Sequence, residues 1–166
     1  MRELLRVTAA ILAAVWMTAP AAFGAETGTD TAVTRESARM TASGLVPDDG
    51  VFQYTEQCGD AYEVVYYSEE ERSYYTIRVS VFTGEVASIS VSLLDSRGSR
   101  EAVLTEEEAG AIASEDAGEV WVESVALDTV AGRKRYDVKC VGDGLEADYQ
   151  INPESGRIIK KTIQYL

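Results

Sequence analysis

The chain has 166 residues, with 15 Lys and Arg, 28 Asp and Glu and no His, so its net charge at pH 7 is −13. This negative charge argues against binding to nucleic acids or to anionic membrane surfaces, because both attract basic patches. Without His the usual general base at neutral pH is missing, and the sequence contains no Gly-x-Ser-x-Gly elbow and no phosphate-binding glycine loop. We therefore do not expect an enzyme, although a hydrolase built on two carboxylates stays open.

Residues 1–25 have the pattern of a signal peptide. Basic residues begin the segment, an apolar stretch follows over residues 7–17, and small residues precede a cleavage site at Gly24 or Ala25. An uncleaved membrane anchor is the alternative, but spanning usually needs about 20 apolar residues. We expect cleavage, a secreted or extracytoplasmic protein, and no membrane insertion after cleavage.

Residues 26–33 are small, polar and aperiodic, which is typical of a flexible segment. A short helix is predicted over residues 34–43, because Gly44 and Pro47 follow it. From Val51 onward apolar residues alternate with polar ones, and β-branched and aromatic residues dominate. This alternation predicts four strands, over residues 51–56, 62–68, 73–82 and 85–94.

Residues 95–103 are a polar, glycine-bearing linker, and the second half follows. Thr105 and Glu108 have the spacing of a capping box, which predicts a helix that Gly118 ends. Its apolar face consists of Ala109, Ile112, Ala113 and Ala117. A helix this short is marginal alone, so we expect it to pack on the strands that follow. Those strands are predicted over residues 119–128, 134–141, 144–152 and 157–165.

Gly142 and Asp143 are predicted to form a two-residue hairpin turn. The resulting pairs are Cys140 with Leu145, Val138 with Ala147, and Tyr136 with Tyr149. A shift by one residue would place Glu146 opposite Cys140 and bury a charge, so we expect the first register.

The orientation of Trp121 stays open. The neighbouring apolar residues Val120, Val122, Val125 and Leu127 can share one face of a strand only if a bulge interrupts the alternation. Trp121 therefore either lies in the core or covers the joint between the two halves.

The two halves share a sequence pattern with a period near 70 residues. The segment Tyr-Glu-Val at residues 62–64 matches Tyr-Asp-Val at residues 136–138, and residues 79–86 match residues 151–158. In the second half, the Leu-Thr-Glu-Glu-Glu-Ala helix start, the Tyr-Asp-Val strand and the Asn-Pro-Glu-Ser-Gly-Arg-Ile turn resemble the PepSY domain. Asn152 stands where that family usually has an acidic residue, which is a conservative change in a turn.

The resemblance covers residues 104–166, and residues 34–94 look like a degenerate copy whose helix lacks the Thr-x-x-Glu-Ala start. It implies an α+β fold of two tandem repeats, each with one helix packed on a four-stranded antiparallel sheet. This architecture is similar to that of the β-lactamase inhibitory proteins. PepSY domains occur in metallopeptidase propeptides and in partners of cell-wall or spore lytic enzymes. The resemblance therefore implies a secreted, non-catalytic protein-binding module without a cofactor, whose partner is a peptidase or a cell-wall hydrolase.

The hairpin over residues 65–75 holds the candidate binding residues. With a symmetric loop Tyr66 pairs with Tyr75 and Tyr67 with Tyr74, and the family register turns the first pair toward the helix. The second pair is then left on the open face of the sheet, as expected of interface anchors, although an aromatic pair can also serve only to stabilise a hairpin. The predicted partner-binding residues are Tyr67, Tyr74, Arg78, Glu63 and Thr76.

Cys58 and Cys140 are the only cysteines, and in an exported chain they can form one disulfide. Cys140 also fits a small buried apolar residue. Two thiols without His cannot complete a zinc site, so we expect no metal. Acidic residues cluster at 48–49, 69–71 and 106–108, and residues 143–148 only faintly resemble a calcium loop. An envelope-associated structural protein and a small-ligand or cation-binding module are the other function classes that the sequence leaves open, together with the oligomeric state.

Overall fold

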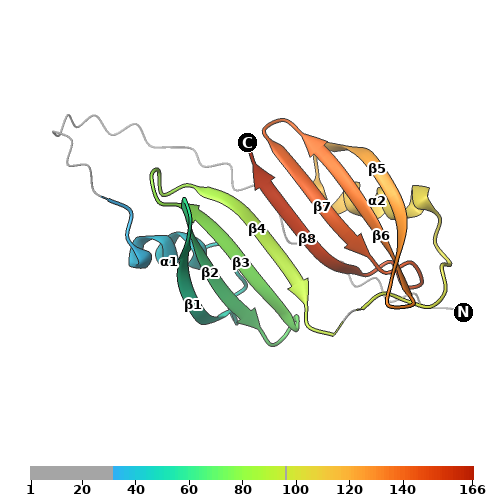
Figure 1. Ribbon diagram of the computed structural model, residues 1–166, viewed down its shortest axis with the longest axis horizontal. Coiled ribbons are helices and arrows are strands. Elements are labelled where there is room, and N and C mark those ends of the chain that lie inside the picture. The colour runs from blue at the N-terminus through green and yellow to red at the C-terminus, as the bar shows by residue number, and fades with distance from the viewer. Residues whose placement is uncertain (1–31, 96) are drawn as a thin grey trace, which may run out of the picture. The chain divides into compact units, whose positions relative to one another are not determined.

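The computed structural model describes residues 32–95 and 97–166, which form two helices and one antiparallel sheet (Figure 1). The elements of the first half are α1 (Arg35–Ser43), β1 (Val51–Cys58), β2 (Ala61–Ser68), β3 (Ser73–Ser80) and β4 (Val86–Leu93). Those of the second half are α2 (Glu106–Ala117), β5 (Val120–Val130), β6 (Arg133–Gly142), β7 (Leu145–Ile151) and β8 (Ile158–Tyr165). The predicted signal peptide, residues 1–25, lies outside the described residues, as does most of the segment 26–33. Neither of the two described helices has the length and apolar character needed to span a membrane.

The sheet is continuous, with eight strands in the order β1-β2-β3-β4-β8-β7-β6-β5. This order corrects the prediction of a separate four-stranded sheet under each helix. β4 and β8 pair along the middle of the sheet, from Ser88 opposite Gln164 to Ser92 opposite Lys160. The pairing satisfies backbone N–H and C=O groups that would otherwise line a free edge in each half.

Both helices cover the same face of the sheet. α1 packs on β1, β2 and β3, whereas α2 packs on β5, β6 and β7. Ile89 packs on the core under α1 and lies directly opposite Ile163, which packs on the core under α2. Residues paired across neighbouring strands project to the same side, so the two cores lie on one side of the sheet. We call the opposite side, which no described helix covers, the open face.

Small side chains let α1 lie close to its strands. Ala38 and Ala42, one turn apart, are fully buried. Thr34 caps the helix by accepting a hydrogen bond from the Ser37 N–H, and the Ser37 hydroxyl in turn accepts one from the Thr34 N–H. Ser37 thus occupies the capping-box position that Glu108 occupies in the second half. The predicted inward residues of the strands are buried against α1, namely Val64, Tyr66, Tyr75, Ile77 and Val79, with Tyr62 partly buried beside them.

The core under α2 follows the prediction closely. Ala109 and Ala113 are fully buried, and Ile112 and Ala117 pack at the margin. The predicted capping box is present: the Glu108 N–H donates to Thr105 Oγ1 at 3.2 Å, and the Thr105 N–H donates to Glu108 Oε2 at 2.8 Å. The strands contribute Tyr136, Val138, Cys140, Ala147, Tyr149 and Ile151.

The predicted register of the β6–β7 hairpin is wrong by two residues. Asp143 and Gly144 form the turn, and the pairs are Gly142 with Leu145, Cys140 with Ala147, Val138 with Tyr149, and Tyr136 with Ile151. Gly144 has φ +74°, a conformation that glycine adopts without strain. Gly142 pairs within the strand at a position with little room for a side chain, because a Cβ there would lie 3.0 Å from the Glu119 carbonyl oxygen. A shift by two leaves every inward residue inward, so alternation alone did not reveal it.

β5 contains the bulge that lets its apolar residues share one face, a question that the sequence left open. The register shifts between Val122 and Ser124. Val122 therefore lies opposite the buried Cys140, and Val125 lies opposite the buried Val138. Trp121, opposite Val141, is 61% exposed and projects to the open face. It belongs to neither core.

Matched contacts recur in the two halves. The Tyr62 hydroxyl donates to the Val33 carbonyl at 3.4 Å, and the Tyr136 hydroxyl donates to the Leu104 carbonyl at 2.7 Å. In each case the acceptor residue immediately precedes the N-cap of the helix. The turns after β3 and β7 also match: Ser80 Oγ and Asn152 Oδ1 each accept two backbone N–H groups from residues two and three positions ahead.

Candidate functional site

The open face of the first half carries a group of tyrosines, of which Tyr54 and Tyr74 are exposed and Tyr67 is half-buried. Tyr67 lies opposite Tyr74, as predicted, with their ring centroids 5.0 Å apart and the rings tilted by 46°. Tyr74 is 39% exposed. The pair of Tyr66 and Tyr75 points to the opposite side, into the core under α1, which confirms the predicted hairpin register.

Two residues of β1 extend this group, and the sequence analysis missed both. A bulge between Phe52 and Tyr54 places Val51 opposite Tyr67 and Tyr54 opposite Val65, so both project to the open face. Val51 is 58% exposed and Tyr54 is 48% exposed. Strict alternation would have put them on opposite sides, since they are three positions apart. We call Val51, Tyr54, Tyr67 and Tyr74 the tyrosine patch.

The residue beneath the tyrosine patch is buried. Val65, between Tyr54 and the tyrosine pair, projects to the open face yet is only 5% exposed, so its neighbours cover it. On the other side of β1, Phe52 packs edge-on against Tyr66 at 5.6 Å, and the Arg39 guanidinium lies 4.6 Å from its ring centroid. Core contacts therefore hold the strands in place, while Tyr54 and Tyr74 remain exposed to solvent.

Two carboxylates that form no ion pair among the described residues border the patch. Glu56 and Glu63 lie directly opposite each other on the open face. Neither takes part in any ion pair found within the described residues. Arg78, the cross-strand neighbour of Glu63, contacts Asp60 at 3.6 Å. Like charges directly opposite each other destabilise a sheet, whereas the opposite charge of Arg78, across from Glu63, acts in the other direction without forming an ion pair with it.

The Tyr54 hydroxyl donates a long, 3.5 Å hydrogen bond to Glu63 Oε1. Partial desolvation, and then the negative charges of Glu63 and Glu56, raise the pKa of Tyr54 above its ordinary value. All five predicted binding residues share the open face. Tyr67 lies opposite Tyr74, Glu63 opposite Arg78, and Thr76 opposite Val65.

The open face of the second half is polar, and two of its basic side chains form ion pairs. Lys139 lies 3.1 Å from Glu123 and 3.5 Å from Glu146, and these contacts raise its pKa, the hydrogen bond with Glu123 most of all. Arg135 lies 3.2 Å from Asp128 and 3.3 Å from Asp137. An open depression of about 560 Å³ lies here, lined by Ser124, Ala126, Asp137, Lys139, Asp148, Gln150, Lys160, Thr162 and Gln164 along with parts of Val138 and Tyr149. Small-molecule pockets are mainly apolar, so this lining does not resemble one.

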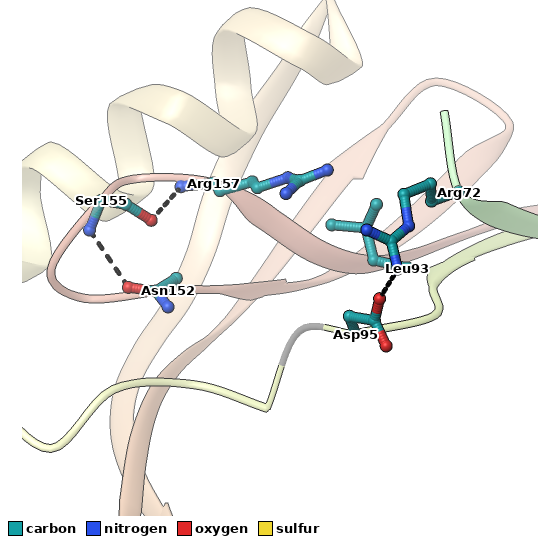
Figure 2. Close-up of a pocket in the computed structure, with 6 residues that line it drawn as sticks. All are labelled: Arg72, Leu93, Asp95, Asn152, Ser155 and Arg157. Atoms are coloured by element: carbon teal, nitrogen blue, oxygen red, sulfur yellow. Dashed lines mark hydrogen bonds and ion pairs between the residues drawn. The ribbon is translucent and has the colours of Figure 1, made fainter. Parts of the chain in front are cut away.

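A smaller pocket lies at one end of the sheet (Figure 2). Its volume is about 200 Å³, and Arg72, Leu93, Asp95, Asn152, Ser155 and Arg157 line it. The Arg72 guanidinium is ion-paired with Asp95, and the Asn152 side-chain oxygen is already used by the N–H groups of its own turn. Ligand pockets usually measure about 300–1,000 Å³, so this one is small for a ligand.

The acidic clusters have structural partners. Asp49 accepts hydrogen bonds from the Glu70 N–H and the Ser68 hydroxyl, which lower its pKa and tie the loop before β1 to the β2–β3 turn. Glu71 accepts a hydrogen bond from the Tyr75 hydroxyl, and Glu108 closes the capping box of α2. Over residues 32–95 and 97–166, no three His, Cys, Asp or Glu residues are grouped so that they could hold a metal ion.

The two cysteines are free in the structure, and the disulfide considered from the sequence is not formed. Cys140 is fully buried in the core under α2, where burial raises the pKa of its thiol. Cys58 is exposed at the end of β1. In the structure Cys140 is therefore a small buried residue and not half of a disulfide.

Comparison with known proteins gives matches among solved structures and to one family model. No curated protein matches the chain. Among solved structures, a candidate lipoprotein from Clostridium difficile 630 is 18% identical over 75% of this chain and 88% of its own, with a TM-score of 0.36. A cysteine-rich secretory protein from Staphylococcus aureus subsp. aureus Mu50 is 11% identical over 77% of this chain and 43% of its own, with a TM-score of 0.40.

The family model named PepSY, described as "Peptidase propeptide and YPEB domain", matches residues 103–162. This match spans α2 and the strands β5 to β7 together with most of β8. It includes the capping box and the Asn152 turn that suggested the resemblance. The second half of the chain is therefore a PepSY domain.

Proposed function

We propose that this protein is a non-catalytic module that binds another protein through the tyrosine patch. The observation that carries the proposal is the group of three tyrosines with Val51 on a face that no described helix covers. Tyrosine rings bury a large area at little cost in conformational entropy, and they are enriched in protein interfaces. The family description links PepSY domains to peptidase propeptides, which supports a peptidase, or a related cell-wall hydrolase, as the partner.

We infer that residues 34–94 are a diverged copy of the PepSY domain. The matched tyrosine contacts before each helix and the matched turns after β3 and β7 support this inference. When the two copies are superposed by these matches, the pair of Tyr67 and Tyr74 corresponds to the cross-strand pair of Val141 and Glu146. The two copies then share a scaffold and differ on the open face, which carries tyrosines in one and paired charges in the other.

The encounter is expected outside the cytoplasm. The pattern of residues 1–25 supports export, and the acidic composition suits a soluble protein in the extracytoplasmic space. The proposed role is regulation of the partner, by restraint or by assistance during its folding. Assays of the activity of the captured partner, with and without the protein, would distinguish the two.

Affinity capture tests the proposal. The full chain serves as bait against the culture medium and envelope of its own source, beside the Tyr67→Ala/Tyr74→Ala variant. We expect the wild-type chain to capture a peptidase or wall hydrolase. The double variant should capture at least about tenfold less of this partner, because central aromatic anchors each contribute about 2 kcal/mol or more to binding. A Tyr54→Ala variant should show a smaller loss in the same direction.

The matched control is Val141→Ala/Glu146→Ala, which alters the corresponding pair in the second half. It should capture the partner as the wild type does. Urea denaturation of each variant separates binding from folding. Unchanged capture by the Tyr67→Ala/Tyr74→Ala variant would contradict the proposal, and a large loss of stability in that variant would identify the pair as structural.

A further inference from the structure

The charges beside the tyrosine patch restrict what can dock there. The chain has a net charge of −13, and Glu56 and Glu63 lie opposite each other without a described cation partner. A second copy of this chain would bring the same carboxylates to the contact, and nucleic acids or anionic lipids would be repelled. A polypeptide with a positive charge at this position would instead remove the repulsion between the two carboxylates. The complementary occupant is therefore a basic segment of another protein.

The position of the patch at a sheet edge suggests the conformation of that segment. β1 is the first strand of the sheet and is exposed along almost its whole length. The bulge at Gln53, whose side chain donates to the Val51 carbonyl, occupies the start of the free edge. Residues 54–58 continue beyond the bulge with regular pairing to β2. An extended segment can add to a free edge of this kind through main-chain hydrogen bonds.

The other edge of the sheet, β5, provides an internal comparison. Beside it, the open face carries ion pairs of Arg135 and Lys139 with neighbouring carboxylates. The β5 residues that line the depression, Ser124 and Ala126, are small, and Trp121 on the same face lies outside this lining. Of the two edges, as the structure describes them, the β1 edge is the one that combines exposed tyrosines with carboxylates outside any described ion pair.

We propose, resting on the proposed function, that the partner presents an extended segment that pairs with β1. Alternate side chains of a strand project to the same face, so residues of the segment two positions apart lie beside Tyr54 and Glu56. An apolar residue of the segment packs on Val51 and Tyr54. A Lys or Arg two positions away lies against Glu56 and Glu63.

A synthetic peptide tests this chemistry without knowledge of the partner. The probe is the blocked peptide Val-Thr-Lys-Thr-Val, whose symmetric pattern allows parallel or antiparallel pairing, and its comparison has Glu in place of Lys. Titration into the full chain is followed by amide chemical shifts. We expect the Lys peptide to shift the amides of residues 54–58 and to bind at least about tenfold more tightly than the Glu peptide, with an advantage that shrinks as salt is added.

The variant Glu56→Gln/Glu63→Gln should reduce the difference between the two peptides to about twofold or less. It removes a pair of repelling charges, so its stability should equal or exceed that of the wild type. The control Asp137→Asn/Glu146→Gln, on the open face of the second half, should leave peptide binding unchanged. Equal binding of the two peptides, shifts at β5 in place of β1, or an unaltered preference in the Glu56→Gln/Glu63→Gln variant would overturn the inference.

The inference and the proposed function fail in different ways. If the captured partner depends on Tyr67 and Tyr74 but binds Glu56→Gln/Glu63→Gln as well as the wild type, the segment chemistry is wrong and protein binding by the patch stands. If no partner depends on the tyrosines, the proposed function fails whatever the peptides do.

Discussion

Ser90 and Thr162 lie opposite each other where β4 pairs with β8, and their hydroxyl oxygens are 3.1 Å apart. This ladder joins two halves whose cores are separate clusters of buried residues. The neighbouring pair of Ile89 and Ile163 projects toward the helices, one isoleucine packing on each core. The ladder thereby links the two cores through hydrogen bonds and through side-chain contact.

Because of this link, we expect the two halves to unfold together. Ile77 and Ile151 are each fully buried, one in each core, and replacing either with Ala should lower the free energy of unfolding by about 2–5 kcal/mol. The test is urea denaturation followed by far-ultraviolet circular dichroism and by the fluorescence of Trp121 in a Trp16→Phe background. Ile77→Ala should shift both transitions by the same amount, although Trp121 lies in the other half. A fluorescence transition that stays in place would show that the halves unfold independently.

Asp116 is expected to hold the end of α2 onto the sheet. Its carboxylate lies 2.9 and 3.1 Å from Lys161 Nζ and accepts a hydrogen bond from the Tyr149 hydroxyl at 2.9 Å. Asp116→Asn should lower the free energy of unfolding by about 1–3 kcal/mol, because Lys161 is then left partly buried without its counterion. The neighbouring Glu115→Gln removes a carboxylate from the same helix turn without such contacts and should be neutral or slightly stabilising. An equal loss in both variants would show that the contacts with Lys161 and Tyr149 are unimportant.

Stability should fall at alkaline pH. Burial, and then the charge of Asp116, raise the pKa of Tyr149 above the ordinary value of 10.0, and burial with Glu71 does the same for Tyr75. The folded state keeps these phenol protons while the unfolded state loses them, so the stabilisation is complete below about pH 10 and declines above it. Melting temperatures from about pH 8.5 to about pH 11 should decrease, and less steeply in Tyr149→Phe. The same slope in that variant would rule out Tyr149 as a source of the decline.

The capping box of α2 should contribute to stability and to its acid dependence. Thr105→Ala should cost about 1 kcal/mol of unfolding free energy, because the Glu108 N–H loses its acceptor. The N–H and hydroxyl groups of Thr105 lower the pKa of Glu108 below 4.5. The stabilisation by the ionised form is therefore present above about pH 4.5 and is lost as the pH falls further. Glu108→Gln should flatten the pH dependence in that range, as measured by urea midpoints, and an unchanged profile would contradict this role.

Local sequence signals predicted most of the secondary structure. The predicted helices and strands agree with the observed ones to within a few residues at each end, because capping residues, turn glycines and the period of the apolar residues act over short distances. The hairpin of Tyr67 and Tyr74 was also predictable, since a symmetric loop fixes which residues face each other. The bulge in β5 was one open alternative, because four apolar residues could share one face only with it, and the structure decided the question.

The missed features have physical causes. A shift of the β6–β7 hairpin by two residues keeps the same side chains inward, so only the backbone demands of Gly142 and Gly144 distinguish it from the predicted register. The bulge in β1 that brings Val51 and Tyr54 to the tyrosine patch has its sequence signal in the broken alternation of Val51, Phe52 and Tyr54. Broken alternation is also the signal that raised the possibility of a bulge in β5.

The sequence by itself determined the two runs of one helix and four strands, the inward faces of those strands and the family of the second half. Only the tertiary structure decided that β4 pairs with β8 in one sheet, that Val51 and Tyr54 join Tyr67 and Tyr74, and that Glu56 lies opposite Glu63. The reason is that alternation specifies which side of a strand is buried. Which strands become neighbours, and at which register, depends on backbone hydrogen bonds between segments far apart in the chain.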